Sequence, residues 1–327
     1  MKKVIYLNNG RSALNVGIKI LSLKKGSVIL VPEIICDVVI EIILKNNLKI
    51  NYYKLNDKFQ PIWSELNKKS YKNVSCILMV HFFGYPQNLS KFKKIKKEKK
   101  IYLIEDNCHS LNIKHKNKIL GMSGDIGIDS PRKLINDLYS GGRLFINKNF
   151  NYDLNYIKEY RPNGLKKLKK KIKYHFPNLK KKFKFLKKRP IYESPYSFSG
   201  KDKNFSLKKM DEISRKKLAK LNLGDESLKR TRRFNQLNNF AKKNNIKPVF
   251  KMSKNLIPLY FVGITKNPNH TKKIFDWGWK NNIEIVSWPS FYKKSKLRNS
   301  LLKKWKKYIC IPLDQSLQIK YKIFKIN

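Results

Sequence analysis

The sequence predicts an α/β protein with a mostly parallel central sheet flanked by helices. Two observations support this fold class. Short apolar runs of strand length follow one another along the first half of the chain, and segments of about ten to fifteen residues with helical spacing separate them. A helical connection returns the chain to the same edge of the sheet, so successive strands run parallel.

Each element of the first half has its own signal. Apolar residues recur at helical spacing in three segments, residues 11–26, 36–48 and 89–100. Apolar, β-branched or aromatic residues fill six short runs, residues 27–32, 49–55, 74–84, 101–106, 125–129 and 143–147. We expect these runs to be the strands of one sheet.

The second half predicts a smaller αβ unit. From about residue 150 to 205 the pattern weakens into basic, turn-rich sequence. Helical spacing returns over residues 210–223, 226–245 and 268–281, and strand-like runs occupy residues 256–264, 283–289 and 308–313. We therefore expect a large α/β domain over residues 1–225 and a small C-terminal domain over residues 226–327.

Composition limits the possible classes of protein. The chain has 327 residues and is 41% hydrophobic, which suffices for a folded core. Its four cysteines lack the spacing of a zinc site or a disulfide scaffold, so no metal is expected. The N-terminal apolar run VIYL is too short for a signal peptide, and no apolar stretch has the length of a membrane span. We expect a cytoplasmic protein.

The net charge of +52 has two interpretations. Lysine is abundant in every segment together with Asn, Ile and Tyr, which is the usage of an AT-rich genome and would give a solvated basic surface. The segment 165–189 differs, because it has 13 Lys or Arg in 25 positions and no acid. Apolar residues Leu165, Leu168 and Ile172 recur there at helical spacing, so a basic amphipathic helix could contact anionic lipid, nucleic acid or a phosphorylated substrate.

Reactive side chains of the first half gather at the predicted strand ends. The carboxyl ends of parallel strands are where such sheets bind ligands. The side chains expected there are Cys36, His81, Asp106, His109, Ser130 and Lys133. Lys133 stands between an apolar run and the pair Gly141–Gly142, where the pattern predicts an interior position.

Three of these features match what pyridoxal phosphate (PLP) requires. Residues 10–13 open a helix, whose N–H groups and positive dipole end suit a phosphate. Asp106 could keep the pyridine nitrogen protonated, and Lys133 could form a Schiff base. The alternatives are a metal-binding or turn-capping role for Asp106 and an ordinary surface position for Lys133.

Eight short segments also follow the order of a known family. They are GRSAL (10–14), VPEIIC (31–36), VHFFGYP (80–86), IEDNCHSL (104–111), LGMSGDIGIDSPRKL (120–134), TRRFNQL (231–237), IEIVSWPS (283–290) and CIPLDQSL (310–317). This series resembles the DegT/DnrJ/StrS-type sugar aminotransferases, which have the fold type I of PLP-dependent aspartate aminotransferase. The resemblance spans nearly the whole chain except about residues 150–205.

The resemblance implies an activity and a role for each matching position. The activity is transfer of an amino group, usually from glutamate, to a keto-sugar attached to a nucleotide. Lys133 would form the Schiff base and move a proton between substrate and cofactor, Asp106 would pair with the pyridine nitrogen, and His109 would lie beside the ring oxygen. The phosphate would be held by Gly10, Arg11, Ser12, Ala13 and Ser130.

The chain departs from the family pattern at several places. Cys36 stands on the cofactor face, where the family commonly has an aromatic residue. Lys133 follows Ser130 after a shorter step than in many members, and the step from Lys133 to Gly141 is about one residue longer. The family's GxNyRM segment is not recognisable. Residues 207–214 would be its remnant, and the basic segment 165–189 lies in the same region, so substrate binding could be rebuilt there.

The family resemblance also implies a homodimer, because its active sites lie between subunits, and an amino sugar product for a surface polysaccharide or related glycan. One alternative is a PLP-dependent sugar dehydratase, but those relatives replace the lysine by histidine, and this chain retains Lys133. The other is a basic relative without catalysis that binds a polyanion or a membrane surface through residues 165–189.

Overall fold

The computed structural model describes residues 3–111, 114–115, 118–135, 137–162, 164–165, 207–281, 283, 285–286 and 298–313. The basic segment 165–189, apart from its first residue, lies outside these ranges, as does most of the strand-like run 283–289.

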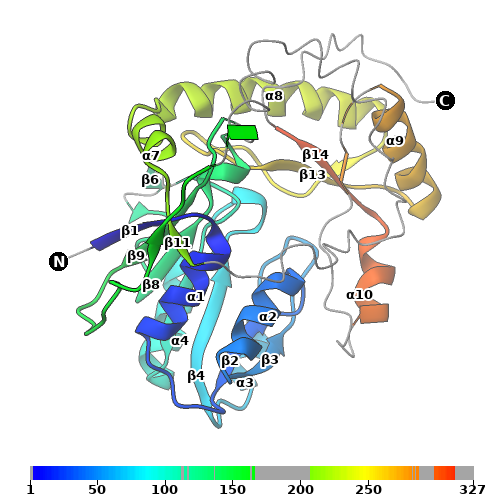
Figure 1. The fold of residues 1–327 in the computed structure, drawn as a ribbon. Helices are drawn as coiled ribbons and strands as arrows, with labels where there is room; N and C mark the ends of the chain where they lie inside the picture. The colour runs from blue at the N-terminus through cyan, green and yellow to red at the C-terminus, as the bar shows by residue number, and fades with distance from the viewer. Residues whose placement is uncertain are drawn as a thin grey trace.

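The central sheet has nine strands within the described ranges (Figure 1). Their order is β10-β11-β1-β9-β8-β5-β4-β2-β3. The strands are β1 (Lys3–Leu7), β2 (Val28–Pro32), β3 (Lys49–Tyr53), β4 (Val74–Val80), β5 (Tyr102–Asp106), β8 (Ile126–Asp129), β9 (Gly142–Ile146), β10 (Lys158–Glu159) and β11 (Lys208–Lys209). From β1 to β3 only β9 runs against the others, which confirms the predicted mostly parallel sheet.

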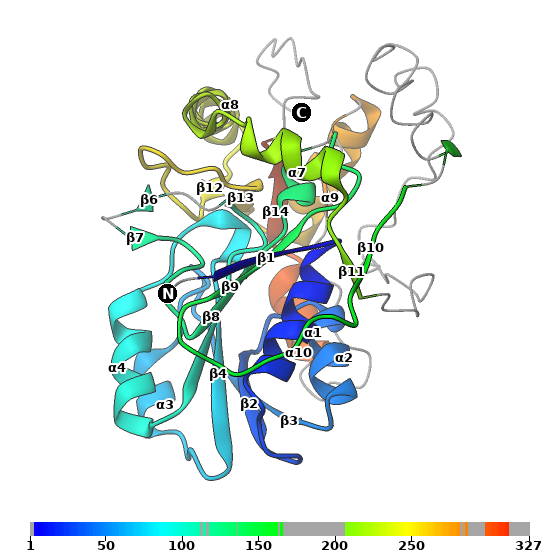
Figure 2. The ribbon, with the colours of Figure 1, turned by 60° about the vertical axis from the view of Figure 1, so that its left-hand side comes forward.

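Helices cover both faces of this sheet (Figure 2). They are α1 (Gly10–Ile20), α2 (Asp37–Lys45), α3 (Trp63–Lys68) and α4 (Leu89–Lys99). Helix α1 packs on β8 and β9 and beside α2, while α4 packs on β5 from the other side. Side-chain caps begin the longer helices: Asn9 accepts from the N–H of Ser12 in α1, and Asn88 accepts from Lys91 in α4.

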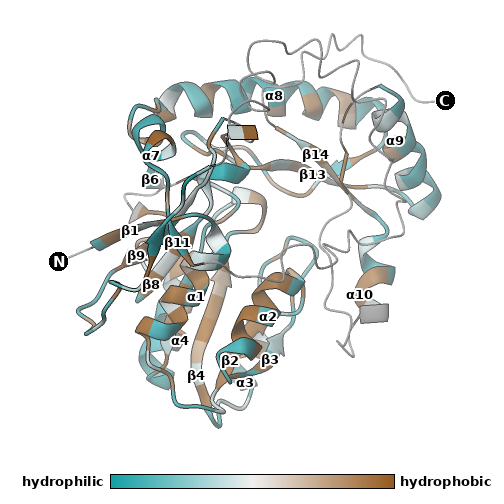
Figure 3. Ribbon diagram, viewed as in Figure 1, coloured by the Kyte–Doolittle hydropathy of each residue, from teal (hydrophilic) through white to brown (hydrophobic). Residues whose placement is uncertain are grey.

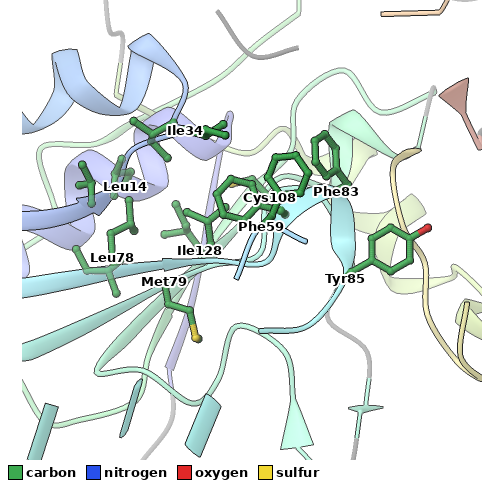
Figure 4. Close-up of a cluster of buried hydrophobic side chains, with 14 of the residues drawn as sticks. Leu14, Ile34, Phe59, Leu78, Met79, Phe83, Tyr85, Cys108 and Ile128 are labelled. Carbon is green, nitrogen blue, oxygen red and sulfur yellow. The ribbon is translucent and has the colours of Figure 1, made fainter. Parts of the chain in front are cut away.

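The strands at the centre of the sheet carry apolar residues on both faces because helices bury both faces. In β4, five successive residues from Cys76 to Val80 are buried. Leu78 and Met79 leave this strand on opposite sides, as the pleat requires (Figure 4). The hydropathy colouring accordingly shows β4 as an apolar strand between helices. Helix α8, on the outside of the molecule, is mostly hydrophilic (Figure 3).

The second half forms a three-stranded antiparallel sheet with helices around it. Its elements are α7 (Glu212–Ala219), α8 (Leu223–Lys243), β12 (Lys247–Pro248), β13 (Tyr260–Ile264), α9 (Pro268–Lys280), α10 (Arg298–Trp305) and β14 (Tyr308–Pro312). Helix α8 has 21 residues and runs across β12 and β13 at the top of Figure 1. The expected boundary at residue 225 falls inside its first turn, and the division into two domains stays a prediction.

Several elements were not expected from the sequence. The run VIYL belongs to β1, which lies beside the antiparallel β9, and three short elements (α3, α10 and β12) had no clear periodicity. A small hairpin, β6 (Lys114–His115) with β7 (Lys118–Ile119), was also missed. In the described part of the chain, no helix combines the length and the apolar character needed to cross a membrane.

Candidate active site

The amino end of α1 meets the carboxyl ends of β5 and β8. Gly10, the first residue of α1, is in such close contact that a Cβ there would lie 2.9 Å from Cys108 Sγ and 3.2 Å from Ser130 Cβ. The backbone of the turn before β9 joins the same place, because the Gly141 N–H donates to the Asn8 carbonyl at 2.8 Å. Ser130 Oγ donates to the Gly141 carbonyl at 3.3 Å. Residues predicted from three separate segments therefore come together.

Asp106 is the last residue of β5 and is only 7% exposed. Its Oδ1 accepts a hydrogen bond from the Cys108 N–H at 2.8 Å, which fixes the carboxylate against its own turn. The carboxylate thus has a defined orientation, and Asp106 lies at the carboxyl end of its strand as predicted, while its role toward a cofactor stays a prediction.

His109 is buried and held on one side by the loop after β4. That loop contains the short 3₁₀ helix η1 (Phe82–Gly84), and the Phe83 N–H donates to Nδ1 of His109 at 3.2 Å. The two rings stack with centroids 6.1 Å apart. Burial, reinforced by the positive charge of Lys133, lowers the pKa of His109 well below its usual value. The imidazole is therefore neutral at neutral pH, with its proton on Nε2.

Lys133 ends the 3₁₀ helix η2 (Pro131–Lys133), and its N–H donates to the Ser130 carbonyl at 2.9 Å. The expectation of an interior position is wrong, because the residue is exposed in the described chain. Burying an unpaired ammonium is costly, so the side chain keeps its hydration. Its charge nevertheless acts on Cys36, Cys108 and His109, so these three side chains lie within the electrostatic reach of the amine.

The two cysteines of the site are thiols rather than thiolates. Burial, reinforced by Asp37, raises the pKa of Cys36 to about 11, against the opposing charge of Lys133. Burial also raises the pKa of Cys108, with Asp106 adding to the effect. At neutral pH both side chains are uncharged and weakly polar, which suits contact with a flat aromatic ring more than nucleophilic attack.

The turn at residues 10–13 is already hydrogen-bonded within the chain. The Ser12 N–H donates to Asn9 Oδ1 at 2.9 Å, and Ser12 Oγ donates to Asn8 Oδ1 at 2.6 Å. The Ala13 N–H donates to the Asn9 carbonyl at 3.2 Å. The helix start lies where a phosphate was expected, but the Ser12 hydroxyl contacts Asn8, and its expected role stays a prediction, as do those of Arg11 and Ala13.

A serine and aspartate network behind the site was not predicted. Asp211 and Ser214 begin α7, and Ser140 Oγ donates to the Asp211 carboxylate while Ser214 Oγ accepts from the N–H of Tyr139 at 2.8 Å. The segment at residues 207–214 also adds β11 to the edge of β1. Residues 207–214 therefore lie beside the turn that leads to Gly141, and their equivalence to the family's GxNyRM segment stays a prediction.

A second unpredicted feature is an ion pair between Asp129 of β8 and Arg143 of β9. Asp129 is fully buried, and both of its oxygens accept from Arg143 Nε at 3.1 Å. Burial raises the pKa of Asp129, although the guanidinium opposes this effect. The sequence did hold a signal for this ion pair, because one acidic and one basic residue stand inside two otherwise apolar strand runs.

His81 and Glu105 form a buried pair. Glu105 directly precedes Asp106 in β5, so its side chain lies on the opposite face of the sheet from that of Asp106. His81 Nε2 lies 2.8 Å from Glu105 Oε1, and both side chains are fully buried. The carboxylate also accepts from the N–H groups of Gly121 and Ser123. Burial alone would raise the pKa of Glu105, but His81 and these N–H donors outweigh it and lower the pKa. His81 therefore has a structural partner in this position.

We expect His81→Leu to lower the free energy of unfolding by about 3–5 kcal/mol, because it leaves the Glu105 charge buried without its main partner. Since the folded pKa of Glu105 is depressed, its contribution is present above the unfolded pKa of about 4.3 and is lost as the pH falls further. The difference between wild type and variant should therefore shrink in acid. Urea unfolding at several pH values measures it.

The matched control for this experiment is His270→Leu. His270 is half-buried near the start of α9, and its backbone N–H contacts the Asn267 cap. This substitution should change the unfolding free energy by less than about 1 kcal/mol near neutral pH. Equal losses for the two variants would contradict the buried-pair interpretation.

Comparisons with known proteins identify the family of the chain and its fold. The model of the DegT/DnrJ/EryC1/StrS aminotransferase family matches residues 1–183. The chain is 24% identical over 121 residues to the GDP-perosamine synthase of Escherichia coli O157:H7, a match that covers 37% of the chain but only 33% of that relative.

Solved structures extend the likeness of the fold over nearly the whole chain. A DegT DnrJ EryC1 StrS aminotransferase from Brucella abortus has a TM-score of 0.64 at 16% identity and covers 94% of the chain and 80% of its own. NtdA from Bacillus subtilis, with the cofactor PMP bound, has a TM-score of 0.62 at 15% identity, covering 96% and 70%. These likenesses confirm the predicted fold class.

Proposed function

Because the chain belongs to the DegT/DnrJ/EryC1/StrS aminotransferase family, we propose that it is a PLP-dependent aminotransferase that moves an amino group from glutamate to a nucleotide-linked keto-sugar. The observation that carries this proposal is the convergence of Asp106, His109 and the charge of Lys133 on one buried group beside the amino end of α1. The product would be an amino sugar for a surface polysaccharide or related glycan.

The side chains of this group fit the polar and apolar parts of PLP. The buried carboxylate of Asp106 suits the ring nitrogen of PLP, and the neutral imidazole of His109 suits its ring oxygen. The amine of Lys133 suits its aldehyde. The missing Cβ at Gly10 lets the start of α1 lie close to Cys108 and Ser130, which supports a phosphate site at the first turn of this helix. When bound, PLP supplies an aldehyde that holds an amino group and a ring that accepts electrons.

Each residue has a separate task in this proposal. Lys133 Nζ would hold the cofactor covalently, and after release it would take a proton from the substrate carbon and return it. The Asp106 carboxylate would orient the ring through its nitrogen. His109 would donate Nε2–H, since its depressed pKa keeps the imidazole neutral with Nδ1 occupied by Phe83. Cys36 and Cys108 would give the ring weakly polar contacts.

The substrate class rests on similarity and on charge. The curated relative is named for a GDP-sugar product, which supports a nucleotide-linked sugar here. Exposed Arg132 stands next to Lys133 in the chain, so the described surface at this turn is cationic. A positive surface of this kind attracts a diphosphate group. The proposal includes a homodimer and no metal.

Two spectra test the proposal. We expect the purified protein with PLP to absorb visible light, and glutamate without any sugar should bleach this band as the cofactor accepts the amino group. Glutamine and alanine serve as comparison donors. If none of these amino acids bleaches the band, the aminotransferase proposal is contradicted.

If the protein forms no visible band at all and instead binds polyanions with an affinity that falls steeply with salt, the non-catalytic binding protein would be the correct interpretation. A visible band without bleaching, combined with loss of a sugar hydroxyl, would indicate the dehydratase chemistry.

A further inference from the structure

One arginine of α8 lies buried between two parts of the candidate site. Arg230 is 1% exposed. Its Nη1 donates to the Pro258 carbonyl at 2.8 Å, and its Nη2 donates to the Leu134 carbonyl at 3.0 Å. Glu226, one helical turn earlier, lies 3.8 Å from Arg230 Nε and partly balances the charge. The guanidinium therefore joins two loops that are far apart in the sequence.

The Leu134 carbonyl belongs to the turn that carries Lys133. Leu134 is the residue directly after Lys133, and its N–H donates to the Pro131 carbonyl at 2.9 Å, which closes η2. The Ile135 N–H donates to the same carbonyl. A hydrogen bond to the Leu134 carbonyl therefore fixes a compact turn as a whole, including the backbone from which the Lys133 side chain leaves.

The Pro258 carbonyl belongs to a segment that supports His109. In this segment, residues 256–259, the Ile257 carbonyl accepts from Ser110 Oγ at 3.2 Å, and the Leu259 N–H donates to the Phe83 carbonyl at 2.8 Å. Phe83 in turn holds His109 Nδ1.

Gly84 shows how closely this segment is packed. Its φ is +96°, and a Cβ there would lie 2.4 Å from the His109 carbonyl oxygen and 2.7 Å from Pro258 Cα. Arg230 thus contacts the supports of both the amine and the imidazole.

We propose that Arg230 is a positioning residue that sets the place of the Lys133 turn relative to His109. It acts through two backbone carbonyls. A guanidinium can reach both carbonyls at once because its donors form a rigid planar fork, whereas a single ammonium cannot reproduce this geometry. The inference rests on the proposed function in one respect, namely that the Lys133 amine binds PLP.

The experiment measures which lysine captures PLP. One equivalent of PLP is added to the folded protein and fixed with sodium borohydride, and peptide mapping gives the fraction of label on Lys133. The PLP dissociation constant is measured separately. In Arg230→Met and Arg230→Lys we expect the fraction of label on Lys133 to fall severalfold and the dissociation constant to rise about tenfold, as for loss of a charge-assisted hydrogen bond.

Two control variants lie on the same helix. Arg232→Met removes an exposed arginine of α8 and should leave labelling and PLP affinity unchanged. Leu237→Ala removes a buried apolar contact of α8, so it should lower the unfolding midpoint while Lys133 keeps its label. This second control separates positioning from general destabilisation.

The outcomes distinguish this inference from the proposed function. If wild type does not place its label on Lys133, the proposed function itself fails. If wild type does, and both Arg230 variants label and bind PLP like wild type, the positioning role is overturned. It is equally overturned if Leu237→Ala loses Lys133 labelling to the same degree at the same unfolding midpoint. Should Arg230→Met not fold, Arg230→Lys, which keeps the charge, decides the matter.

Discussion

Lys133→Ala should abolish the visible absorption of the PLP-loaded protein and lower turnover by at least about 10⁴-fold. The reason is that one amine would serve both as the covalent attachment and as the group that moves the proton, and general acid–base catalysis alone contributes roughly 10²- to 10⁴-fold. The fold should persist because Lys133 is exposed and lies in a short turn. Absorption spectra and single-turnover kinetics with glutamate measure the two losses.

The control for this substitution is Lys97→Ala on the exposed face of α4, which should match wild type in both spectrum and rate. A small primary amine such as methylamine should restore part of the lost turnover to Lys133→Ala, since it can replace the missing proton carrier. A visible band of wild-type strength in Lys133→Ala would show that another lysine, or no lysine, holds the cofactor.

Asp106→Asn should lower turnover by about 10²- to 10³-fold, the cost of removing one preorganised charge from a buried site. The amide keeps an Oδ1 that can still accept from the Cys108 N–H, so the turn after β5 should remain folded. The charge that holds a proton on the ring nitrogen is lost, however. Asp106→Glu should retain more activity than Asn, because it keeps the charge with an altered reach.

Asp153→Asn is a closely matched control. Asp153 Oδ1 accepts from the Asn155 N–H at 2.9 Å, which is the same local hydrogen bond on an exposed loop. It should leave turnover and PLP affinity unchanged. If Asp106→Asn retained wild-type turnover, Asp106 would have only the turn-capping role that its hydrogen bond to Cys108 provides.

The fold could be predicted because its parallel centre has a strong local signal. Strands such as β4 are apolar on both faces, and the helices between them have regular spacing. β1 gave no such signal. It is a five-residue run with only Leu7 buried, and its partner β9 follows more than a hundred residues later. Nothing local in such a run shows that a strand so distant in the sequence will pair with it.

The candidate site was predictable where residues follow strands. Asp106, His109 and Ser130 lie where strand order places them, because the carboxyl ends of parallel strands share one edge. The exposure of Lys133 was not predictable, since apolar flanks do not determine where a long charged side chain ends.

The residues that hold the site from outside had no local signature. Arg230 contacts a carbonyl 96 residues earlier, and Ser140 contacts Asp211 across 71 residues. Their polar side chains look like ordinary surface residues in the sequence, and only the packing of distant segments gives them partners.

The location of the acids has a consequence for how this protein responds to ionic strength. Among the described residues, six of the chain's 22 acids are buried, namely Glu105, Asp106, Asp125, Asp129, Asp211 and Glu226. The outer surface is therefore dominated by mutually repelling cations, while attractive ion pairs such as Asp129–Arg143 are shielded from solvent. Dissolved salt screens exposed charges far more than buried ones. Added salt consequently weakens the repulsion between surface cations and leaves the buried ion pairs in place. The free energy of unfolding of this protein should therefore rise with salt concentration.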